Sequence, residues 1–176
     1  WRPLIVGVMS GCVMGVAGGV LVKAFGITGQ VFTAVDSLRI ALGSFTAEFS
    51  LQQELGYRLL MQSNTLSGMA VYFLFSVVLI GLGEELFWRG LLLRSVMKRL
   101  STPYALGIVS ILFAASHCYL FSILSIPAGL FLMALIGGAG LCWGIMAVVY
   151  NSLVPSIISH GIAALILWKY FFFTSS

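Results

Sequence analysis

The chain has 176 residues, of which 60% are hydrophobic and 8% are charged. An ordinary globular domain carries about 25% charged residues, so a water-soluble domain could not cover its surface with so few, and a chain this apolar does not stay disordered. The composition therefore predicts an integral membrane protein. Nine basic residues against five acidic ones give a net charge of +4, which is too sparse for a nucleic-acid-binding surface.

Five apolar stretches are long enough to cross a bilayer as helices of about 20 residues. They lie at residues 3–25, 69–100, 103–120, 126–150 and 152–173. Between the first two, leucines recur every four residues opposite polar side chains, at Leu51, Leu55 and Leu59. This pattern predicts an amphipathic helix in the membrane interface. We therefore predict an all-α polytopic membrane helix bundle with an N-terminal part, 1–68, and a core, 69–176, that holds four of the spans.

The first span carries a glycine at every fourth position, at Gly7, Gly11, Gly15 and Gly19. Such a column lets a second helix approach the backbone closely, which supplies dispersion contacts where lipid removes the hydrophobic driving force between helices. Two interpretations follow. The column packs against another helix of the same chain, or it holds a second copy or another membrane protein.

Basic residues collect between the second and third spans, at Arg94, Lys98 and Arg99. Loops that carry Lys and Arg favour the cytoplasmic side of a membrane. We therefore expect this loop and the N-terminus to be cytoplasmic and the C-terminus to lie on the opposite side.

Five ionisable side chains lie inside three of the spans, where each is costly to bury. They are Glu84, Glu85, Arg89, His117 and His160. With a helical rise of about 1.5 Å per residue, Glu84 and the two histidines fall roughly 12–21 Å from the ends of their spans. That depth is the middle third of a hydrocarbon core about 30 Å thick. The spacing permits one polar site at the centre of the bundle.

The order of the charges indicates a division of roles. Glu85 and Arg89 stand four residues apart with the acid first, the favourable order for an ion pair on a helix. Glu84 is rotated by about 100°, so it is free to meet His117. A carboxylate held against an imidazole in a dry site can deprotonate water, and His160 could donate to an oxyanion. The alternative is a buried ionic network that only holds helices together.

Three short motifs in this region are similar to those of a known family. Residues 84–90 (EELFWRG) resemble an EExxxR motif, residues 113–117 (FAASH) an FxxxH motif, and residues 151–160 (NSLVPSIISH) the approach to a third, histidine-containing motif. In this order, and each inside a span, they resemble the CPBP family of CAAX proteases and bacteriocin-processing enzymes, also called the Abi family. The resemblance extends over roughly residues 69–168.

The resemblance implies a glutamate-dependent intramembrane endopeptidase that cuts a membrane-associated peptide or protein. Glu84 would be the general base with help from His117, and His160 would assist the oxyanion. The supporting residues would be Glu85, Arg89 and Phe113. No metal or other cofactor is implied, and a zinc site would lack the HExxH spacing on one helix. The family also implies a multi-pass protein of a bacterial cytoplasmic or thylakoid-type membrane.

One position departs from the family pattern. The third motif commonly continues with Asn or Asp four residues after the histidine, and that residue here is Ala164, which has no donor for an oxyanion. Loss of one such donor costs about 10²–10³ in turnover. A second hypothesis is therefore a non-proteolytic membrane scaffold, immunity or assembly factor that binds another membrane protein. A third, an ion- or proton-coupled carrier, is disfavoured because paired broken-helix repeats are missing from the pattern.

Overall fold

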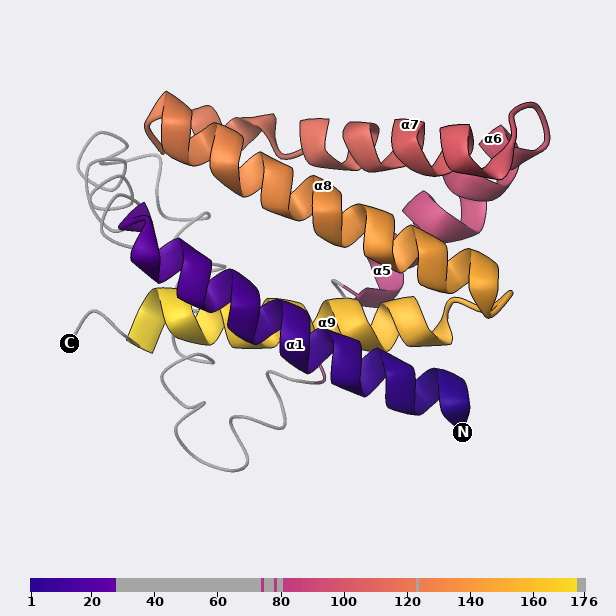
Figure 1. The fold of residues 1–176 in the computed structure, drawn as a ribbon, viewed down its shortest axis with the longest axis horizontal. Helices are drawn as coiled ribbons and strands as arrows, with labels where there is room; N and C mark the ends of the chain where they lie inside the picture. The colour runs from indigo at the N-terminus through magenta and orange to yellow at the C-terminus, as the bar shows by residue number, and fades with distance from the viewer. Residues whose placement is uncertain (28–73, 75–77, 79–80, 123, 174–176) are drawn as a thin grey trace, which may run out of the picture.

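The computed structural model describes residues 1–27, 74, 78, 81–122 and 124–173, and every regular element within them is a helix (Figure 1). The elements are α1 (Arg2–Ala24), α5 (Gly83–Glu85), the π-helix η2 (Leu86–Leu93), α6 (Arg94–Met97), α7 (Thr102–Ala115), the 3₁₀-helix η3 (Cys118–Ser122), α8 (Ile126–Val149) and α9 (Val154–Phe173). The all-α prediction is confirmed for these residues. The predicted interfacial helix around Leu55 lies outside them.

Three helical segments are long and apolar enough to cross a membrane: Arg2–Ala24, Thr102–Phe121 and Ile126–Val149. They coincide with the predicted first, third and fourth spans. The predicted fifth span coincides with α9, whose apolar part Val154–Leu167 is shorter. The predicted second span is described continuously from residue 81, where a helical backbone continues to Met97. The described bundle is that of a multi-pass membrane protein.

All four prolines of the chain occupy the second residue of a long helix, at Pro3, Pro103, Pro127 and Pro155. In the first turn of a helix the backbone N–H has no partner within the helix, so its loss to proline has no cost, and the fixed φ of proline already suits the helix. The prolines therefore mark where α1, α7, α8 and α9 begin.

The glycine column of α1 packs against α9 of the same chain, and the two helices lie side by side in Figure 1. A Cβ added at Gly7 would lie 2.8 Å from the carbonyl oxygen of Pro155, and one at Gly11 would lie 2.7 Å from that of Ser159. At Gly15 the nearest atom would be Cβ of Ile166, at 2.7 Å. Only glycine allows so close an approach, so these three positions serve packing within the chain. The fourth glycine of the column, Gly19, is also buried.

The N-terminus, the loop between α6 and α7 and the turn between α8 and α9 lie at one end of the bundle, as Figure 1 shows. The C-terminal ends of α1 and α9 and the start of α8 lie at the other end. Arg2 begins α1, Arg94 begins α6, and Lys98 and Arg99 lie in the loop between α6 and α7. These elements place the four basic residues at the first end, which we call the basic end. By the positive-inside tendency, the basic end is the side we predict to be cytoplasmic.

Candidate functional site

The site is built around a buried ion pair between consecutive turns of α5 and η2. Nη1 of Arg89 donates to Oε1 of Glu85 at 2.7 Å, and the side chains are 1% and 0% exposed. Nη2 of Arg89 donates to the carbonyl oxygen of Gly140 on α8 at 2.8 Å. The carbon centre of the guanidinium lies 4.5 Å from the ring centroid of Phe113. The predicted pairing of Glu85 with Arg89 is therefore present, and it ties η2 to α7 and α8.

The close approach of Arg89 to α8 depends on a glycine that the motif analysis did not single out. A Cβ at Gly140 would lie 2.7 Å from Cδ1 of Phe113 and 3.0 Å from Nη2 of Arg89. Any larger residue would push the guanidinium or the ring away. The glycine-rich stretch of this span was the available signal, but glycine in a membrane helix indicates close packing without naming the partner.

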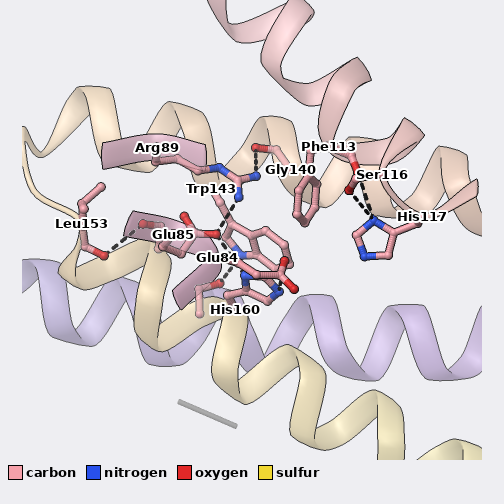
Figure 2. Close-up of polar contacts among 12 residues, drawn as sticks. Glu84, Glu85, Arg89, Phe113, Ser116, His117, Gly140, Trp143, Leu153 and His160 are labelled. Carbon is pink, nitrogen blue, oxygen red and sulfur yellow. Dashed lines mark hydrogen bonds and ion pairs between the residues drawn. The ribbon is translucent and has the colours of Figure 1, made fainter. Parts of the chain in front are cut away.

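His160 on α9 joins the two glutamates (Figure 2). Its Nδ1 lies 3.0 Å from Oε1 of Glu85. Since a carboxylate only accepts, Nδ1 carries the hydrogen in this contact. Its Nε2 lies 3.9 Å from Oε2 of Glu84, which is within ion-pair range but too long for a direct hydrogen bond. His160 is therefore held firmly by Glu85 and faces Glu84 with its other nitrogen.

Glu84 is more exposed than Glu85 and lacks its short polar contacts. Its side chain is 36% exposed, although Oε2 itself is buried and has no hydrogen-bond partner among the described residues. Nε2 of His160, which faces Glu84, is a hydrogen-bond donor only when the imidazole carries hydrogens on both of its nitrogens.

Aromatic rings set the position of the imidazoles. Trp143 of α8 stacks on His160 with ring centroids 3.8 Å apart and an interplanar angle of 16°. Phe113 makes edge contacts with both histidines, at 6.1 Å to His160 and 5.1 Å to His117. The FxxxH motif thus contributes its phenylalanine as a wall shared by Arg89 and the two histidines.

A polar chain connects this wall to α1. Nε1 of Trp143 donates to Oγ of the buried Ser159 at 3.0 Å, and Oγ of Ser10 donates to the same oxygen at 3.0 Å. Sequence reasoning missed both Trp143 and Ser159. A tryptophan near the middle of a span was a signal, because its N–H needs a partner away from the headgroups.

His117 lies at the end of α7 and stands apart from the glutamates in Figure 2. Its Nδ1 is 2.9 Å from the carbonyl oxygen of Phe113 and 3.2 Å from Oγ of Ser116, which itself donates to that carbonyl at 2.7 Å. These side-chain contacts compete with the next backbone bond, and within the predicted span the α-helix ends at Ala115 and the 3₁₀-helix η3 follows from Cys118. A carbonyl only accepts, so Nδ1 holds the hydrogen and Nε2 has a free lone pair.

The predicted meeting of Glu84 with His117 is replaced, in the described residues, by the contact of Glu84 with His160. Ala164, one turn beyond His160, is half-buried. No group of three or more His, Cys, Asp or Glu side chains in the described part of the chain is arranged to hold a metal ion.

One family model, described as "Type II CAAX prenyl endopeptidase Rce1-like", matches residues 65–166, which hold the three motifs. The chain belongs to this Rce1-like family. The match covers more than half of the chain and all the motif residues from Glu84 to His160, and membership implies an intramembrane protease. Helix α1 lies outside the matched residues. No curated protein and no solved structure matches the chain.

Proposed function

We propose that the protein is an intramembrane endopeptidase that uses Glu84 to activate water. The observation that carries the proposal is the contrast between two adjacent glutamates. Glu85 is fully buried and bonded to both Arg89 and His160, whereas Glu84 is 36% exposed and its Oε2 lies 3.9 Å from Nε2 of His160, too far for a direct hydrogen bond. A structural network would have little use for the second carboxylate, while a general base must reach a water molecule and a substrate.

The roles follow from which atoms are free. The oxygen of a water molecule attacks the scissile carbonyl carbon while its proton passes to Glu84. Nε2–H of protonated His160 donates to the oxyanion that forms. The lone pair on Nε2 of His117 accepts the second hydrogen of the water and orients it. When the C–N bond breaks, Glu84 returns its proton to the leaving nitrogen. Glu85 and Arg89 act by holding His160 in place.

The dry surroundings make this chemistry effective. Glu85, Arg89 and His160 are all at most 6% exposed, and charges in such an environment interact more strongly than in water. Ala164 supplies no second donor, so we expect turnover below that of a site with Asn or Asp there by about 10²–10³.

The membrane setting belongs to the same proposal. The chain would cross the bilayer about five times, with residues 1–68 as an N-terminal span and interfacial helix and residues 69–176 as the protease core. A bacterial cytoplasmic or thylakoid-type membrane would hold it with the basic end inside. The substrate would be a membrane-associated peptide or protein. The family description makes prenylated C-terminal peptides the first class to assay.

The second candidate is a non-proteolytic binding role, because Ala164 lacks the hydrogen-bond donor to the oxyanion that proteolysis would use. One experiment separates the two. Membrane-protein N-termini are compared between cells that express wild type and cells that express Glu84→Gln, and both proteins are affinity-purified. New N-termini with wild type alone would support the protease. Identical termini, with one partner retained by both proteins, would establish the binding role instead.

A further inference from the structure

A cleft opens at the basic end of the bundle, between the C-terminal part of η2, α6 and the end of α8. Its volume is about 270 Å³, which is smaller than the pockets that enclose drug-sized ligands. Its lining combines apolar walls with polar side chains: Arg89, Leu93, Arg94, Met97, Lys98, Ala147, Val148 and Asn151. The cleft therefore has room for a compact headgroup beside apolar surface.

Two cationic side chains in the lining have no polar partner among the described residues. Arg94 and Lys98 are exposed, and neither side chain has an ion-pair or hydrogen-bond partner in the part of the chain that the structure describes. Arg89 also lines the cleft, but its guanidinium is already engaged by Glu85 and Gly140. The free positive charge of the cleft thus comes from Arg94 and Lys98.

The turn that follows α8 adds a neutral donor. Asn151 has a φ of 44°, a left-handed conformation that Asn tolerates better than most residues. Its side chain is exposed and its amide offers two N–H donors. Cationic and amide donors around a small opening are suited to a phosphate, which accepts several charge-assisted hydrogen bonds.

We propose that this cleft binds the phosphate headgroup of an anionic phospholipid. The cleft is lined by residues of η2, α6, the loop after α6, the end of α8 and the turn after it. These elements lie at the basic end of the bundle in Figure 1, where we expect the helices to leave the membrane. Met97 and Val148 give the glycerol and upper acyl chain an apolar wall. A soluble anion would gain nothing from that wall, so the lining favours a lipid over free phosphate. Arg94 and Lys98, which the proposal uses, have no part in the proposed protease chemistry, although Arg89 borders both sites.

The test uses the full chain in nanodiscs of phosphatidylcholine with and without phosphatidylglycerol, and native mass spectrometry to count retained lipids. Arg94→Gln and Lys98→Gln remove one cation each, and Arg99→Gln is the matched control. Arg99 is exposed in the same loop but does not line the cleft. Arg94→Lys and Lys98→Arg keep the charge and report on any loss that comes from misfolding. Inorganic phosphate is added as a soluble competitor.

We expect wild type to retain phosphatidylglycerol in preference to phosphatidylcholine. Each Gln substitution at Arg94 or Lys98 should weaken retention by about tenfold or more, the loss of one hydrogen bond to a charged group. Arg99→Gln should weaken it by less than about fivefold, the diffuse contribution of one surface cation. Equal losses in all three variants, no preference between the two lipids, or full displacement by inorganic phosphate would each overturn the proposal.

Discussion

Substitution of Glu85 should lower the free energy of unfolding much more than substitution of the adjacent Glu84. Glu85→Gln removes the partner of Arg89, which is 1% exposed and 2.7 Å from the Glu85 carboxylate. Removing one member of a buried ion pair costs about 3–5 kcal/mol of unfolding free energy. Gln keeps an acceptor for His160, so we expect the lower end of that range. Glu84→Gln affects a side chain that is 36% exposed and whose Oε2 lies 3.9 Å from Nε2 of His160, and should cost less than about 1 kcal/mol.

The assay is reversible unfolding in mixed detergent and SDS micelles, monitored by tryptophan fluorescence. A double-mutant cycle on Glu85 and Arg89 is measured in the same way. Glu85→Leu combined with Arg89→Met replaces the ion pair by apolar groups of similar size. Such a replacement is often neutral or stabilising, so the double variant should recover most of the stability that either single change loses. If Glu85→Gln were no less stable than Glu84→Gln, the structural role assigned to Glu85 would be refuted.

Three further predictions concern packing and the donor set. Gly11→Ala should destabilise the bundle by about 1–3 kcal/mol, because its Cβ meets the Ser159 backbone at 2.7 Å, whereas Gly138→Ala meets nothing within 4 Å and should be neutral in the same unfolding assay. Ala164→Asn should raise the cleavage rate by up to about 10²-fold if it restores an oxyanion donor, and an unchanged rate would count against that donor. Trp143→Phe keeps a ring against the imidazole and should lower cleavage by less than about tenfold, while Trp143→Ala should lower it about 10²-fold by displacing His160. Equal rates for the two Trp143 variants would contradict the stacking role.

Much of the fold follows from local signals in the sequence. Apolar length predicts α1, α8 and α9, and the position of each proline marks where a long helix begins. The Glu85–Arg89 pair was predictable because both residues lie on one helix, where a spacing of four residues brings them together. The glycine column predicted close helix packing, but only the three-dimensional arrangement identifies α9 as its partner.

Contacts between helices were beyond sequence reasoning. The positions of His117 and His160 along their apolar spans indicate how deep each lies in the membrane. They do not indicate which histidine faces Glu84, because that depends on the rotation of α7 and α9 about their axes. The side-chain bonds of Ser116 and His117 to Phe113 accompany the end of the α-helix at Ala115, inside the predicted span, and no hydropathy pattern reports this. Trp143 and Gly140 act through neighbours that lie from 16 to 51 residues away in the chain, so their roles emerge only from packing.

The most direct test of the account is cleavage by purified protein in liposomes. The substrate is the protein whose new N-terminus depends on wild type in cells, and the enzymes compared are wild type, Glu84→Gln and Gly138→Ala. The account predicts that wild type and Gly138→Ala release the fragment, while Glu84→Gln remains folded and binds the substrate but cleaves it at least about 10³-fold more slowly. Cleavage by folded Glu84→Gln within about tenfold of wild type would contradict the central claim that Glu84 activates the water.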